Sequence, residues 1–187
     1  MPSIDTKARY DAVAQAFHWV IVALIATQFV LAKTAMALPL GMQKLILFAR
    51  HKSFGMTILM LALLRLAWRL ANPPPAPPPG TTPIEKALAR ATHTGFYMLL
   101  FAMPLTGWLM SSAKNYSVSW FGWFTWPNLI GPNEAAFKLL RETHDIMSDF
   151  LLAIIVLHVL AALKHHFYDK DDVLLRMLPF TRPKRRS

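Results

Sequence analysis

Two histidines, His144 and His158, stand fourteen residues apart within one apolar segment, residues 143–166. In an α-helix each residue turns the chain by ~100° and advances it by ~1.5 Å, so the two imidazoles share a face and lie ~21 Å apart. That distance is about two-thirds of a ~30 Å hydrocarbon core. Two stacked imidazoles on one membrane helix indicate axial ligands for two haem groups, provided that other segments supply the opposite ligands.

The composition limits which kinds of site this chain can build. It has 187 residues and no Cys, which excludes disulfides, thiolate metal sites and iron–sulfur clusters. Hydrophobic residues make up 55%, charged residues 16%, and the mean hydropathy is +0.34, as in a small polytopic membrane protein. The net charge of +10 does not predict nucleic-acid binding, because the basic residues lie between long apolar runs. We expect one domain, residues 1–187.

Four apolar segments are long enough to cross a bilayer: residues 12–34, 53–71, 91–113 and 143–166. A signal peptide is the competing interpretation of the first, but its uncharged run of twenty-one residues exceeds a usual signal core and contains His18 and Gln28. The proline-rich stretch 73–79 cannot be helical and reads as a stiff linker. The sequence therefore predicts an all-α, integral membrane four-helix bundle with two haem b groups in its core.

The distribution of basic residues predicts the orientation of the bundle. Four spans leave both termini on one side, which holds thirteen of the twenty Lys and Arg, including Lys7 and the run Arg182-Pro183-Lys184-Arg185-Arg186. Loops rich in Lys and Arg stay in the cytoplasm. We therefore expect a multi-pass protein of the bacterial inner membrane, in contact with lipid, with both termini cytoplasmic.

This topology sorts the histidines by depth. His51 and His144 fall at the outer level, whereas His18 and His158 fall at the inner level with His93 as a third candidate. An isolated buried His is usually a satisfied core residue, but polar groups at membrane depth are costly and usually functional. Bis-imidazole haem is favoured over zinc, because no carboxylate or third His converges at the outer level.

Two further residues follow from the same helical register. Arg65 comes fourteen residues after His51, so it should reach the depth of the inner haem and pair with a propionate; snorkelling to the interface is the alternative. Gly55, one turn after His51, would leave room for a porphyrin to lie against the second span.

The pattern resembles the bacterial cytochrome b561 family, which is related to the b-type cytochrome subunits of nickel–iron hydrogenases and formate dehydrogenases. The resemblance covers nearly the whole chain. It rests on His18-Trp19, His51-x-x-x-Gly55, the proline-rich loop, Pro104-x-x-Gly107, His144 with His158, His165-His166-Phe167 and Leu174-Leu175-Arg176-Met177.

The resemblance implies an outer haem held by His51 and His144 and an inner haem held by His18 and His158. It implies electron transfer from the periplasmic face to ubiquinone, with superoxide oxidised to dioxygen as the expected activity. His93, His165 and His166 are then candidates for the quinone side. A cationic outer mouth would attract the superoxide anion, with Lys44, Arg50, Lys52, Lys114, Lys138 and Arg141 as its candidates.

Two other functions remain open at this point. The chain could be the haem-bearing membrane anchor and electron-transfer subunit of a periplasmic dehydrogenase or hydrogenase, with no substrate of its own. It could also be a small proton-coupled transporter in which the histidines form a relay.

Overall fold

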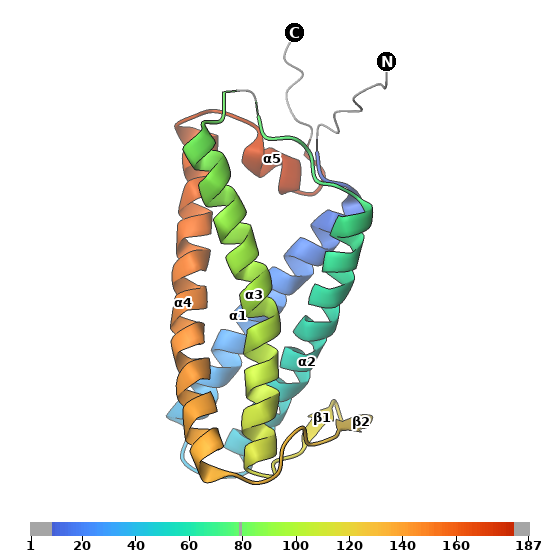
Figure 1. Ribbon diagram of the computed structural model, residues 1–187, viewed down its shortest axis with the longest axis vertical. Coiled ribbons are helices and arrows are strands. Elements are labelled where there is room, and N and C mark those ends of the chain that lie inside the picture. The colour runs from blue at the N-terminus through green and yellow to red at the C-terminus, as the bar shows by residue number, and fades with distance from the viewer. Residues whose placement is uncertain (1–8, 79, 182–187) are drawn as a thin grey trace.

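Four long helices dominate the computed structural model, which describes residues 9–78 and 80–181 (Figure 1). They are α1 (Ala12–Ala37), α2 (Met42–Ala71), α3 (Pro83–Ala113) and α4 (Glu134–Phe167). A hairpin of β1 (Val118–Trp120) and β2 (Phe124–Trp126) precedes α4, and the short α5 (Val173–Met177) follows it. All four long helices have the length and hydropathy of membrane spans, which confirms the predicted all-α membrane bundle of four helices. Lys7 and the basic run 182–186 lie outside the described residues.

The helices extend beyond the predicted spans, mainly at their starts. α2 begins at Met42 rather than at 53, and α4 at Glu134 rather than at 143, so His51 and His144 lie well inside their helices. Side-chain capping, and not the limit of the hydrocarbon, sets the starts of α3 and α4. The Asn133 side chain accepts a 2.9 Å hydrogen bond from the backbone of Ala136. A Thr82–Glu85 capping box starts α3 in the same way.

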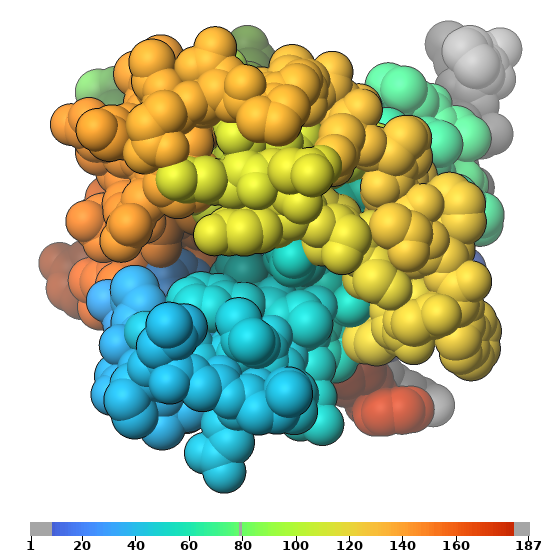
Figure 2. Space-filling view, turned by 90° about the horizontal axis from the view of Figure 1, so that it is seen from below, coloured from blue at the N-terminus to red at the C-terminus, as the bar shows by residue number. Residues whose placement is uncertain are grey.

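The helices pack as two antiparallel pairs, α1 with α2 and α3 with α4, joined mainly through α2 and α3. Seen from the end opposite the termini, the surface is hollowed between the blue-cyan pair and the yellow-orange pair (Figure 2). Large apolar side chains such as Val30, Leu64 and Leu157 are exposed on the outer faces, as expected for contact with lipid. The main buried cluster joins three helices through Ile21, Ile58, Ala62 and Leu100.

The two ends of the bundle are closed differently. At the hairpin end, the Ser53 hydroxyl donates to the Ser119 carbonyl (2.8 Å) and the Trp120 indole donates to the Thr57 hydroxyl (3.0 Å), which fix the hairpin against α2. At the opposite, termini end, α5 lies between the end of α4 and the start of α1 (Figure 1). The Trp19 indole there donates to the Met177 carbonyl at 3.0 Å.

Candidate cofactor site between the helix pairs

His51 on α2 and His144 on α4 face each other across the two helix pairs, toward the hairpin end. Their ring centroids are 6.4 Å apart, and the ring planes meet at 71°. The Nδ1 atom of His51 is buried and has no hydrogen-bond partner in the described part of the chain. The helical register therefore brings these two side chains together as the sequence predicts.

The Thr106 hydroxyl holds the ring of His144. Its Oγ1 lies 3.1 Å from Nδ1 of His144 and 2.9 Å from the carbonyl oxygens of Ala102 and Met103. A hydroxyl has one proton. When Thr106 donates it to a helix carbonyl, its oxygen accepts from Nδ1–H of His144. That tautomer leaves Nε2 as the free lone pair, the form that a metal requires.

A side chain of α1 lies beside Gly55 in the structure, and the expected contact of Gly55 with a porphyrin stays a prediction. A Cβ at Gly55 would lie 3.1 Å from the amide nitrogen of Gln28. That amide donates to the His51 carbonyl at 3.0 Å. The small residue therefore allows Gln28 to reach the backbone at His51. The position where a small residue borders the His144 ring is Gly107, whose Cβ would lie 3.4 Å from Cε1.

Three histidines meet toward the termini end, with His158 of α4 in contact with both others. Its ring centroid lies 6.4 Å from that of His18 on α1, at an interplanar angle of 67°. It lies 6.0 Å from that of His93 on α3. The edge of Phe96 covers the same imidazole at 5.3 Å. The predicted inner level is thus a real cluster, and His93 belongs to it.

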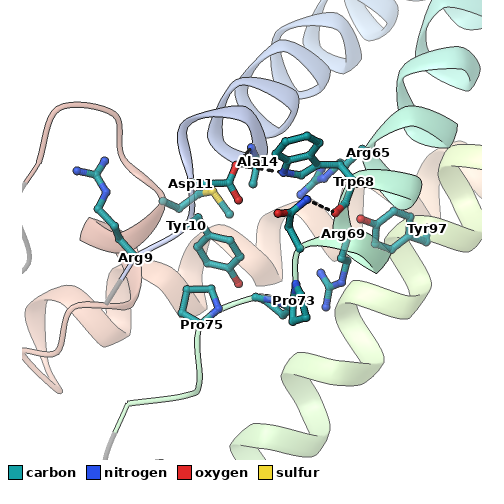
Figure 3. A pocket seen from close by; sticks show the side chains of 13 residues that line it. Arg9, Tyr10, Asp11, Ala14, Arg65, Trp68, Arg69, Pro73, Pro75 and Tyr97 are labelled. Carbon is teal, nitrogen blue, oxygen red and sulfur yellow. Dashed lines mark hydrogen bonds between the residues drawn. The ribbon is translucent and has the colours of Figure 1, made fainter. Parts of the chain in front are cut away.

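Arg65 reaches this inner cluster, as its register predicts. Its guanidinium donates to Nδ1 of His18 at 3.4 Å and lies 5.9 Å from the centre of the Tyr97 ring. Figure 3 shows Arg65, Arg69 and Tyr97 together beside the cavity near the start of α1. The side chain therefore turns into the bundle at the depth of His18.

The spacing of the two cross-pair contacts fits a group held between paired imidazoles. Two collinear metal–nitrogen bonds of ~2.0 Å, plus ~1.2 Å from each nitrogen to its ring centre, separate the centroids by ~6.4 Å. Both His51–His144 and His18–His158 have a centroid separation of 6.4 Å. A zinc site needs three or four converging ligands. Among the described residues one such group of possible ligands occurs, formed by Glu85, His165 and Asp169. It contains none of these core histidines.

The predicted quinone-side pair, His165 and His166, lies at the termini end of α4, beyond this core cluster. Nδ1 of His165 lies 2.7 Å from a carboxylate oxygen of Asp171 and 3.1 Å from one of Asp169. The ring of His166 packs against Phe167 with centroids 4.8 Å apart. The imidazole of His165 thus contacts two carboxylates at this end of the bundle.

The predicted cationic mouth lies at the hairpin end but is partly neutralised. Lys114 forms an ion pair with Glu134, whose carboxylate raises the pKa of Lys114 by accepting its hydrogen bond. Arg141 lies 4.0 Å from Asp145. Lys44 and Lys52 donate to backbone carbonyls and not to carboxylates. Arg50 and Lys138 have no carboxylate within 4.0 Å in the described part of the chain.

Comparison with known proteins gives matches over nearly the whole chain. The family described as prokaryotic cytochrome b561 matches residues 9–180. "Cytochrome b561 homolog 2" of Escherichia coli (strain K12) is 35% identical over 186 residues, 95% of each chain. "Probable superoxide oxidase CybB" of Yersinia pestis is 30% identical over 91% of this chain and 96% of its own length. "Cytochrome b561 homolog 1" of E. coli is 27% identical over 87% and 92%.

Proposed function

Because the chain belongs to the prokaryotic cytochrome b561 family, we propose that it carries electrons through two haem b groups from superoxide at the hairpin end to ubiquinone at the termini end. Family membership makes the chain an integral membrane b-type cytochrome with a role in electron transfer. The number of haems, the donor and the acceptor are the parts that we add.

The observation that carries the proposal is the equal spacing of two histidine pairs. His51 with His144, and His18 with His158, each join one helix pair to the other at 6.4 Å between centroids. We assign the first pair to the outer haem and the second to the inner haem. Haem iron held by two imidazoles supplies reversible one-electron chemistry and offers no open coordination position.

The residues around each pair prepare the imidazoles for this role. Thr106 holds the tautomer of His144 that has a free Nε2. On α4, His144 and His158 project on one face and are separated by fourteen residues, so a single rigid helix fixes the distance between the two levels.

The charge at the hairpin end supports superoxide as the donor. Arg50, Lys52 and Lys138 carry positive charge there, which raises the encounter rate with a small anion. The name of the Y. pestis relative points to the same substrate. Two superoxide anions would each give up one electron and leave as dioxygen, while one ubiquinone takes both electrons and two protons and becomes ubiquinol.

The termini end is the proposed quinone and proton side. We place it in the cytoplasm, because Arg9, Lys86, Arg90, Lys164, Lys170 and Arg176 gather there. His93 in the inner cluster and His165 and His166 at the end of α4 are imidazoles on that side, and an imidazole can act as a proton shuttle. They are our candidates for passing protons to reduced quinone.

The test is to supply superoxide to the purified protein with a soluble ubiquinone analogue. We expect a b-type spectrum, reduction of both haems, and one quinol for every two superoxide anions consumed. A chain without a b-type Soret band would contradict the haem assignment. Haem reduction by other donors, but not by superoxide, would favour the alternative role as an electron-transfer subunit.

A further inference from the structure

Arg65 and Arg69 lie one helical turn apart on α2, and each faces the same aromatic ring. Their guanidinium carbons are 5.9 and 5.8 Å from the centre of the Tyr97 ring. Neither has a carboxylate within 4.0 Å in the described part of the chain. Like charges at this spacing repel, and charge near membrane depth is costly. A bound anion would therefore stabilise these two guanidinium groups.

Asp11 is the acidic residue beside them, and its carboxylate already accepts two hydrogen bonds from other groups. It lines the same cavity of about 30 Å³ (Figure 3). Its Oδ1 accepts hydrogen bonds from the Trp68 indole at 3.1 Å and from the backbone of Ala14 at 2.9 Å. Asp11 thus caps α1 and holds Trp68, and the neighbouring guanidinium groups still lack a counter-ion.

The hydroxyl of Tyr97 adds a third donor to the two guanidinium groups. Its oxygen is buried and has no hydrogen-bond partner in the described part of the chain. An unpaired buried hydroxyl costs free energy, whereas a carboxylate would accept its proton. Two guanidinium groups and one hydroxyl therefore converge from α2 and α3.

The contact between Arg65 and His18 indicates where this anion comes from. Iron binding through Nε2 of His18 would leave the proton on Nδ1, the atom that Arg65 approaches at 3.4 Å. Two donors would then face each other, so Arg65 must turn to an acceptor. Haem b carries two carboxylate groups, which could serve as such acceptors if His18 held the haem.

We propose that Arg65, Arg69 and Tyr97 together bind the carboxylate groups of the inner haem and raise its reduction potential, which favours electron flow toward the termini end. This inference rests on the proposed function, because it requires an inner haem on His18. Positive charge near a haem stabilises the reduced, more negative form. A half-buried pair is screened only weakly by salt.

Redox titration of the purified haem-loaded protein, followed at the absorption bands of each haem, tests the proposal. Arg65→Gln, Arg69→Gln and Tyr97→Phe should each lower the potential of the inner haem and leave the outer haem unchanged. Arg69→Lys should lower it less. Arg90→Gln is the matched control, because it removes one positive charge from the exposed surface of α3 at the same end. Its two potentials should equal those of the wild type.

Unchanged potentials in both Gln variants, with two haems present, would overturn the inference and leave the proposed function intact. If the Gln variants lose the inner haem, the Tyr97→Phe variant decides: a lowered potential of its inner haem supports the inference, and an unchanged potential overturns it. A wild-type protein without haem would instead remove the proposed function itself.

Titrations in nanodiscs of zwitterionic and of anionic lipid separate the sources of the anion. A shift seen only with anionic lipid would assign the site to a phospholipid headgroup and overturn the haem assignment.

Infrared difference spectra give a readout that does not depend on activity. Haem labelled with ¹³C in its carboxyl groups should show redox-linked carboxylate bands that move in Arg69→Gln and not in Arg90→Gln. Bands that are identical in the two variants would contradict a direct contact.

Discussion

The hydroxyl of Thr106 lies 3.1 Å from Nδ1 of His144, and it is positioned to accept the ring proton. Thr106→Val keeps the shape of the side chain and removes the acceptor. We expect the outer haem to bind 10–100-fold more weakly, as is typical when the partner of a metal-bound His is lost. Haem retention during dilution measures this change. Thr143→Val is the control, because the hydroxyl of Thr143 bonds only its own helix, at the Leu139 carbonyl.

The charges at the hairpin end should control how fast superoxide reacts. Arg50→Gln and Lys138→Gln remove positive groups that lack a carboxylate within 4.0 Å in the described residues, so each should slow superoxide consumption, most at low salt. Lys114→Gln removes a charge that Glu134 already neutralises, and we expect a smaller effect. Stopped-flow rates over a range of ionic strength compare the three. Equal, salt-independent rates would argue against an anionic donor.

The Lys114–Glu134 pair also predicts a pH dependence of stability. Glu134 raises the pKa of Lys114 in the folded protein. From neutral pH up to the ordinary lysine pKa the pair therefore stabilises the fold, and this contribution disappears as the pH rises through the raised value. Thermal unfolding of the wild type and Lys114→Gln should differ slightly at neutral pH and converge in strong alkali. A difference that grows with pH would contradict the assignment.

The relative depth of the candidate ligands could be predicted from sequence, because it depends only on the number of helical residues between them. Fourteen residues of helix place His144 and His158 on one face at two depths, and the same interval carries Arg65 to His18. This geometry does not depend on where a helix begins. The helices begin before the predicted spans, at Met42 and Glu134, because they continue through charged turns outside the apolar stretch.

Residues that hold the ligands were harder to recognise. Thr106 and Gln28 are single polar residues in apolar spans, and nothing in their spacing identifies a partner. The local signal for Thr106 was its place between Pro104 and Gly107, where the helix leaves space beside the His144 ring. Gly55 was understood as a space, but only packing identifies Gln28 as the group that fills it.

The close approach of Gln28 to Gly55 makes a prediction about helix packing. Gly55→Leu should push α1 away from α2, break the Gln28–His51 hydrogen bond and destabilise the fold by about 1–3 kcal/mol. Gly55→Ala should be nearly neutral, because the end of Gln28 can move and Ala favours helix. Gln28→Ala combined with Gly55→Leu should recover part of the loss in thermal stability. A double variant as unstable as Gly55→Leu alone would exclude Gln28 as the cause.

The inner cluster offers His158 two possible partners, and haem counting decides between them. His51→Ala and His144→Ala should each lower the haem content from two per chain to one, and the double variant should lose no more, because both remove the same group. His18 matches the 6.4 Å spacing of the outer pair, whereas His93 is closer to His158, at 6.0 Å.

We therefore expect His18→Ala to lose the inner haem and His93→Ala to keep both. The haem-to-protein ratio, measured after purification from cells supplied with excess haem, tests each variant, and His166→Ala serves as a control outside the cluster. Retention of two haems by His18→Ala together with loss of one by His93→Ala would reverse the inner assignment. It would also move the inner haem from between α1 and α4 to between α3 and α4, and so separate it from Arg65.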